Sequence, residues 1–374
     1  MFRTRTAPLL RYFLGRCMKT SLSLMAAWLL VLPILSMSAE DHYSFAEGAR
    51  GFLIRDYNQK LVAFLQTASP EHVRTPKTID EFGAETTENT RQLQATLTGA
   101  HSASGRAGPA EFAAVGLPWP DDFVRSTNLI DCWEGTLNKL EGSAESQDNF
   151  SNVTFGIVGF TSQDGSLQTF LQEANAATNG AVFQLARERL APRDAAKFIE
   201  LVESFHPKSV KKNHDEFVKF VIRNPRADPD EQQPRPEIAQ LFAEFHSIPH
   251  FRDVQLAATR KKSWDGELPD YREQLFGSAA PHSLRIDLFC FDMTVLTNGP
   301  GKKAVRQLEK KPWHDEVERM KQISDAMKRS SEYKDDEDKR ADILERERCI
   351  IDGQGEVHDD DYDLRSFALL PVKE

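Results

Sequence analysis

Two stretches of sequence decide the fold class. Residues 129–136 read LIDCWEGT, and residues 148–162 read DNFSNVTFGIVGFTS. The first stretch belongs to an apolar stripe with helical spacing that runs from Ile130 through Trp133 to Leu140. The second combines β-branched and aromatic residues with two glycines, a pattern typical of a short pair of strands. A helix followed by a small sheet is therefore predicted here.

The rest of the chain has mainly helical periodicity and no internal repeat. The sequence therefore predicts a mainly α protein with a small β-sheet, of the α+β class. Helices are expected at about residues 42–66, 121–140, 167–190, 193–205, 213–223, 235–247, 267–277 and 282–297, with a long charged pair over 302–350.

Glu134 is the first candidate for catalysis. It directly follows Trp133 and lies on the shoulder of the apolar stripe, where Trp133 and Ile130 would half-shield its carboxyl. Such shielding disfavours the ionised form and raises the pKa of a carboxyl, as a general acid at neutral pH requires. Glu141 would have a similar angular position two turns later and is the structural rival. A glutamate on the flank of a helix is also common as a plain solvated charge.

The order of these features resembles the family 46 glycoside hydrolases, the chitosanases. The family's pattern is a glutamate after an aromatic residue at a helix end, then an aspartate, a threonine five residues later and a glycine-bearing strand. In this chain Glu134 follows Trp133, and Thr154 directly precedes a glycine-bearing segment. A second patch agrees, because residues 288–301 read LFCFDMTVLTNGPG, similar to the family's aromatic helix with an aspartate that ends in Gly-Pro-Gly. The resemblance implies a lysozyme-like fold of two lobes with a substrate cleft between them. It also implies endo-type, inverting hydrolysis of β-1,4-linked glucosamine in chitosan.

The resemblance also implies roles for single residues. By motif position, Glu134 would be the general acid, and Thr154 would help to hold the attacking water. Ungapped counting places the family's basic aspartate on Asn149, whose amide cannot serve as a base. The neighbouring Asp148 is therefore the preferred base, and Glu145 is the alternative.

Three positions are expected to bind substrate. Asn149 lies next to the candidate base in the sequence. The family's substrate-binding aspartate after the strand falls on Ser166 by ungapped counting, and Asp164 is close to it.

Asp292 has a different expected role. It lies inside an apolar helix, and a carboxylate buried there has to be paired. We interpret it as one half of a structural ion pair, with Arg346 or Arg348 in a late helix as the partner.

Residues 1–39 have the pattern of a secretory signal peptide: Lys19 precedes an apolar run over 22–35, and small residues lead to Ala39. A run of about 14 residues is shorter than the roughly 20 that span a bilayer. We therefore expect an exported protein, secreted or periplasmic, without stable membrane insertion after cleavage; an uncleaved anchor is the alternative. Residues 40–115 are interpreted as an N-terminal helical extension and linker, and residues 116–374 as the chitosanase-like catalytic domain.

The net charge of the chain limits the kinds of molecule that it is expected to bind. The formal net charge is −10, and residues 1–39 contain five basic residues and no acidic one, so the remainder carries −15. An acidic body would repel a nucleic acid and suits a cationic amino-sugar polymer such as chitosan. The run HDDDYD at residues 358–363 adds to this charge and is interpreted as a solvated acidic loop.

The sequence offers little support for metal or cofactor chemistry. It contains no CxxC pair and no phosphate-binding loop. Cys132 and Cys290 lie in apolar helical patterns and are expected to be buried free thiols. We expect a monomer with no metal and no cofactor.

Two other functions remain open. The same fold could act on peptidoglycan, since the compartment permits it and the loop of the base is altered. Alternatively, the chain could be a non-catalytic polysaccharide-binding protein that has lost its base, as Asn149 suggests.

Overall fold

The structure is a computed structural model, and it describes residues 43–98, 103–134, 140–144, 151–156, 159–223, 233–278, 282–296, 302–328 and 337–372. The chain divides into two units, Met1–His42 and Tyr43–Glu374. Residues 1–39, the predicted signal peptide, lie outside the described residues, so only the second unit is considered below. Among the described residues, no helix is both long and apolar enough to cross a bilayer.

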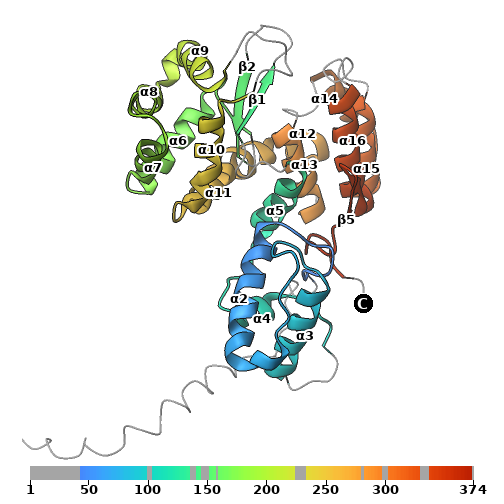
Figure 1. The fold of residues 1–374 in the computed structure, drawn as a ribbon. Coiled ribbons are helices and arrows are strands. Elements are labelled where there is room, and N and C mark those ends of the chain that lie inside the picture. Colours follow the sequence, from blue (N-terminus) through green and yellow to red (C-terminus); the bar gives the residue numbers. More distant parts are fainter. Residues whose placement is uncertain are drawn as a thin grey trace, which may run out of the picture. The chain divides into compact units, whose positions relative to one another are not determined.

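The second unit is mostly helical, with two small sheets (Figure 1), which confirms the predicted mainly α class with a small β component. The helices begin and end as follows: α2 Phe52–Ala68, α3 Ala84–Thr98, α4 Pro109–Ala114, α5 Asp122–Glu134, α6 Ser166–Ala177, α7 Ala181–Arg189, α8 Pro192–Glu203, α9 Val210–Val221, α10 Pro236–Glu244, α11 Phe251–Thr259, α12 Leu268–Phe276, α13 Leu284–Leu296, α14 Lys302–Leu308, α15 Glu316–Lys328 and α16 Glu337–Asp352. A π-helix, Arg260–Glu267, joins α11 to α12.

The larger sheet is antiparallel, with strand order β1-β2-β3. Its strands are β1 Leu140–Ala144, β2 Ser151–Phe155 and β3 Phe160–Thr161. The strands predicted over residues 153–160 are thus β2 and β3, but the prediction of a helix up to Leu140 is wrong. Helix α5 ends at Glu134, and Leu140 pairs with Phe155 in the sheet. The backbone of residues 140–144 completes its hydrogen bonds with β2 instead of continuing the helix.

Helices α6 to α11 enclose an aromatic core next to the sheet. Phe155 of β2 packs edge-on against Phe242, with ring centroids 5.0 Å apart, and Phe160 of β3 stacks on Phe170 of α6 at 4.6 Å. These rings are at most 3% exposed. Burial of such large apolar surfaces is the main force that fixes the sheet against the helices.

Helices α13, α15 and α16 pack against one another, and the chain then forms a hairpin of β4 Gln354–Val357 and β5 Asp360–Asp363. The solvated acidic loop predicted over residues 358–363 is therefore partly wrong. Asp359, Asp360 and Asp361 are exposed, but Tyr362 is buried and its ring packs edge-on against Trp133 of α5. Burial of Tyr362 is one of the contacts that hold the hairpin against α5.

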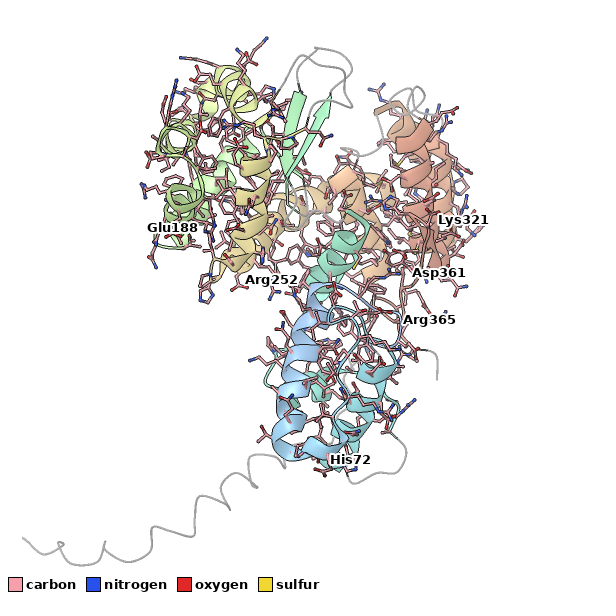
Figure 2. The ribbon with its side chains drawn as sticks, viewed as in Figure 1. His72, Glu188, Arg252, Lys321, Asp361 and Arg365 are labelled. Atoms are coloured by element: carbon pink, nitrogen blue, oxygen red, sulfur yellow. The ribbon has the colours of Figure 1, made fainter. Side chains whose placement is uncertain are left out.

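Residues 43–115 pack within the same unit as the rest of the described chain. Phe45 forms antiparallel bridges with both Ala107 and Phe367, and Arg106 donates to the carbonyl of Arg365 at 3.0 Å. Arg252 of α11, labelled in Figure 2, pairs with Asp56 of α2 at 2.5 Å. Residues 106 and 107, near the end of the segment interpreted as an extension and linker, are thus held in place by specific contacts.

Candidate functional site

Glu134 lies at the C-terminal end of α5, where the chain leaves the helix. Its neighbour Trp133 is buried, whereas the Glu134 side chain is 21% exposed. The apolar stripe of α5 faces the core, with Ile130 and Leu129 fully buried, and this fixes the direction in which the helix end points. The glutamate is therefore a half-buried carboxyl on a rigid support, as the position next to the stripe predicts.

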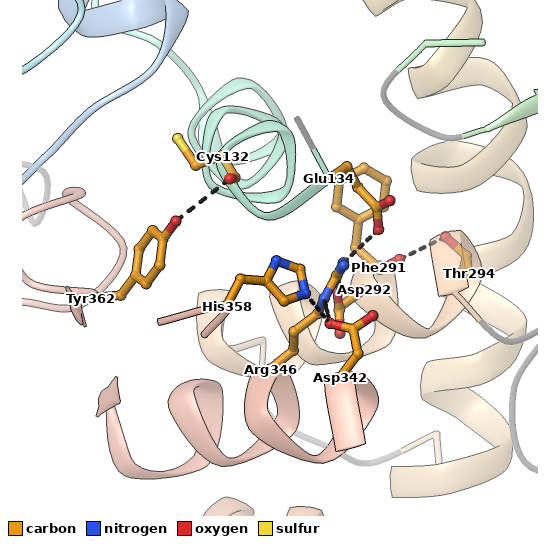
Figure 3. Close-up of polar contacts among 9 residues, drawn as sticks. All are labelled: Cys132, Glu134, Phe291, Asp292, Thr294, Asp342, Arg346, His358 and Tyr362. Carbon is orange, nitrogen blue, oxygen red and sulfur yellow. Dashed lines mark hydrogen bonds and ion pairs between the residues drawn. The ribbon is translucent and has the colours of Figure 1, made fainter. Parts of the chain in front are cut away.

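A buried arginine holds this carboxyl. Arg346 of α16 is 2% exposed, and its Nη1 donates to Glu134 Oε1 at 2.5 Å (Figure 3). Its Nε donates to Asp342 Oδ1 at 2.6 Å, one helical turn earlier on α16. The guanidinium also lies 5.8 Å from the ring centroid of Trp133. Charge-assisted bonds from a planar guanidinium fix direction as well as distance, so Glu134 has one preferred orientation.

Asp292 of α13 is the third carboxyl around Arg346. It is 2% exposed, and its Oδ1 lies 3.8 Å from Arg346 Nη1. Burial raises the pKa of Asp292 from its ordinary 3.8 to about 8, although Arg346 favours the charged form. Burial alone would lower the pKa of Arg346, but Asp292, Glu134 and Asp342 together raise it. At neutral pH the cluster therefore combines a charged arginine with an aspartic acid that keeps its proton.

One of the two partners expected for Asp292 is in place. Because Asp292 keeps its proton at neutral pH, the contact is an ion pair only above the raised pKa of the aspartic acid. Arg346 lies against Asp292, whereas Arg348 is exposed to solvent. The reason is the phase of α16: residues 346 and 350 lie one turn apart on a buried face of the helix, whereas residue 348 is exposed. The contact of Arg346 with Glu134 was not predicted, nor was the role of Asp342.

A second group of predicted residues surrounds β2 and β3. Thr154 of β2 is half-buried and lies opposite Glu141 of β1 and Thr161 of β3. Glu141, the predicted structural rival of Glu134 on the helix, is thus in a strand, and that expectation is wrong. Asp148, Asn149 and Glu145 lie outside the described residues, so the identity of the second carboxylate stays a prediction.

Asp164 and Ser166 build the turn that starts α6. Thr161 Oγ1 donates to Asp164 Oδ1 at 2.9 Å, and the backbone N–H of Ser166 donates to the same oxygen at 2.8 Å. Partial burial alone would raise the pKa of Asp164, but the hydrogen bonds from Ser166 and Thr161 and the nearby Lys262 lower it. Lys262 Nζ lies 3.5 Å from the other oxygen, Oδ2. Asp164 is therefore a carboxylate whose first task is to organise this turn.

The prediction of buried free thiols is confirmed for Cys290 and only in part for Cys132. Cys290 is buried and Cys132 is partly exposed, and both are free, as is Cys349. Within the part of the chain that the structure describes, no group of three or more histidine, cysteine, aspartate or glutamate side chains is placed to hold a metal ion.

Comparison with known proteins finds no family model, no curated protein and no solved structure that matches this chain. The site is therefore interpreted from its own chemistry. It offers one half-exposed carboxyl, fixed on a helix end by a buried arginine, with a protonated aspartic acid behind it. Such a carboxyl can present one oxygen to a bound molecule in a defined direction.

Proposed function

We propose that the chain is an exported glycoside hydrolase, a divergent member of family 46, that cleaves β-1,4 linkages in chitosan or a closely related amino-sugar polymer. In this scheme Glu134 is the general acid. Arg346 binds Oε1, which leaves Oε2 to carry the proton to the glycosidic oxygen. Because a cation favours the ionised form of a carboxyl, the contribution of the arginine in this scheme is to position Glu134 and not to favour its acid form. A positioned proton donor of this kind contributes about 10²–10⁴-fold to the rate.

The single observation that supports the proposal most is the hydrogen bond from the buried Arg346 to Glu134. An inverting glycosidase needs its acid at a fixed place relative to the sugar, since the second carboxylate has to activate a water on the opposite face. A plain solvated glutamate on a helix flank needs no buried arginine, and burying one is expensive unless it is paired. Glu134 differs from such a residue in this respect.

The remaining parts of the mechanism follow from the resemblance. Asp148 would act as the base, with Glu145 as the alternative, and Thr154 would help to hold the attacking water. Asn149, Asp164 and Ser166 would contact the sugar, and the fold would have two lobes with the cleft between them. The net charge of −15 without residues 1–39 agrees in sign with a polycationic substrate.

The test is hydrolysis of soluble chitosan, followed by the release of reducing ends. We expect Glu134→Gln to lower turnover by about 10²–10⁴-fold. Glu244→Gln is the matched control, because Glu244 is 24% exposed and is likewise bonded to an arginine, Arg189. Glu244→Gln should retain full turnover. Equal rates for Glu134→Gln and the wild type would refute the proposal.

Three further measurements refine the proposal. Inversion predicts that proton NMR detects the α-anomer as the first product from a β-linked polymer. Asp148→Asn compared with Glu145→Gln identifies the base, since only the true base should abolish turnover. Clearing of cell-wall suspensions, measured beside chitosan hydrolysis, distinguishes peptidoglycan as the substrate.

A non-catalytic polysaccharide-binding protein is the second candidate. Asn149 favours it, because that position would otherwise hold the base. This alternative predicts that chitosan binds without turnover and that Asp148→Ala changes nothing.

A further inference from the structure

The turn of the β4–β5 hairpin has an unusual sequence for its backbone. Val357 pairs with Asp360, so the turn consists of only His358 and Asp359. Both have positive φ, 53° and 66°. Two-residue turns with positive φ at both positions strongly prefer Asn-Gly, because side chains with a Cβ are strained there. Strain of this kind persists where the surroundings impose it, and it is often found at functional sites.

The imidazole of His358 anchors the turn to α16. Its Nε2 lies 2.7 Å from Asp342 Oδ1 on α16, and the backbone N–H of His358 faces Glu345 Oε2 at 3.4 Å. His358 is 46% exposed and Asp342 is 23% exposed. A carboxylate can only accept hydrogen bonds, so Nε2 carries the proton in this contact.

The hairpin also contacts α5, through Tyr362 of β5. The ring of Tyr362 packs edge-on against Trp133 with centroids 5.9 Å apart, and its hydroxyl donates to the carbonyl of Cys132 at 3.5 Å. The hairpin is therefore seated against the two helices that carry Glu134 and Arg346.

One oxygen joins the histidine to the candidate acid. Asp342 Oδ1 faces His358 Nε2 and also accepts from Arg346 Nε at 2.6 Å. Arg346 Nη1 then donates to Glu134 Oε1 (Figure 3). Since the guanidinium is rigid and planar, a constraint on its Nε also constrains its Nη1. His358, Asp342, Arg346 and Glu134 thus form one continuous chain of hydrogen bonds from the solvent-exposed turn to Glu134.

We propose that His358 is a positioning residue for the general acid: it fixes Asp342, Asp342 fixes the plane of Arg346, and Arg346 fixes Glu134. This inference rests on the proposed function. His358 does not touch the reacting atoms in this scheme, so its loss should lower kcat and leave KM nearly unchanged. The strained turn is retained because it delivers the imidazole to Asp342.

The decisive variant is His358→Asn. Asparagine tolerates positive φ, so the turn can be kept, but its shorter side chain cannot reach Asp342 as the imidazole does. We expect kcat on chitosan to fall about tenfold, within the ~100-fold that a 1 Å misplacement of a catalytic group can produce. The thermal midpoint should change by no more than about 2 °C.

Two controls match this variant. Asp359→Gly alters the same turn and relieves its strain but leaves His358 in place, so full kcat is expected. His250→Asn removes a histidine that also has positive φ, 64°, and also pairs with an aspartate, Asp253, at 3.1 Å. It lies at the start of α11 and should likewise retain full kcat. The proposal is overturned if His358→Asn has wild-type kcat, or if its kcat falls only in proportion to a loss of folded protein.

Failure of the proposed function would look different. In that case the wild type itself releases no reducing ends, and the NMR chemical shifts of the His358 ring decide the inference alone. If the chain of bonds couples the two groups, Glu134→Gln should change the chemical shifts of the His358 ring protons, whereas Glu244→Gln should not. Unchanged ring shifts in Glu134→Gln would overturn the coupling.

Discussion

Arg346 Nη1 and Glu134 Oε1 lie 2.5 Å apart although 212 residues separate them in the sequence. The bond joins the end of α5 to the middle of α16, and Arg346 is 2% exposed. Because three carboxyls surround one guanidinium, the arginine is the shared partner of the whole cluster. The stability of the fold and the geometry of the candidate site therefore depend on the same side chain.

Replacement of Arg346 by methionine should destabilise the fold strongly. The change leaves the Glu134 carboxylate without its cationic partner, and breaking a buried ion pair typically costs about 3–5 kcal/mol. Urea unfolding measures this loss. Glu134→Gln in the same chain should recover part of the loss, because it removes the unpaired carboxylate. Arg189→Met, at a more exposed ion pair with Glu244, should have little effect, and a similar loss there would contradict the argument.

Stability should decrease as the pH rises from about 4 to about 8. The folded-state pKa of Asp292 is raised to about 8, so the folded chain keeps a proton that the unfolded chain releases. Its stabilising contribution is complete below the ordinary carboxyl pKa and is lost as the pH approaches 8. One proton corresponds to a slope of at most about 1.4 kcal/mol per pH unit.

Asp292→Asn should reduce that slope in urea unfolding measured at several pH values. Burial also raises the pKa of Glu347, to about 7, and this gives a contribution of the same sign. Glu347→Gln should therefore remove a second, separate part of the slope. An unchanged pH dependence in the double variant would mean that neither carboxyl keeps its proton in the folded state.

Two glycines that precede helices provide a matched pair. Gly165 and Gly180 both have positive φ, 77° and 86°, directly before α6 and α7. A Cβ on Gly165 would lie 2.2 Å from Cζ of the buried Phe205, whereas a Cβ on Gly180 would meet no atom within 4 Å. We expect Gly165→Ala to lower the unfolding free energy by about 2–4 kcal/mol and Gly180→Ala by about 1 kcal/mol. Equal losses in urea unfolding would show that Phe205 moves aside at no expense.

The three described cysteines should stay reduced and react slowly. Burial raises the pKa of all three thiols, that of Cys349 to about 12. The thiols of Cys290 and Cys349 should resist a thiol-specific reagent at pH 8 until the protein unfolds, and partly exposed Cys132 should react first. A reductant should not change the thermal midpoint. A drop of several degrees would contradict this prediction, because it would mean that two of the cysteines form a disulfide.

Helices with strong apolar periodicity could be predicted from the sequence. The helix expected over 193–205 is α8, Pro192–Glu203, and its buried residues repeat on one face. The helix expected over 167–190 is instead two helices, α6 and α7. The break falls at Asn179 and Gly180, which both have positive φ, and an Asn-Gly pair is a signal for a turn.

The strands β1, β4 and β5 could not be predicted in the same way. LEGSA in β1 and DDYD in β5 have weak strand propensity, so these strands depend on partners elsewhere in the chain. The candidate site, too, could be predicted only in part. Glu134 could be singled out from its neighbour Trp133, and Asp342 and Arg346 have the spacing of a helical ion pair. The contact of Arg346 with Glu134 depends on tertiary packing, which no local pattern encodes.

Phe45 pairs with Phe367 through an antiparallel bridge, so the first and last parts of the compact unit lie side by side. The two ends could therefore be joined by a short glycine-serine connection, with new ends opened in a surface turn such as the one at Gly180. Circular permutants of this kind would keep α5 next to α16. They would also show whether residues 43–115 have to be made first for the remainder to fold.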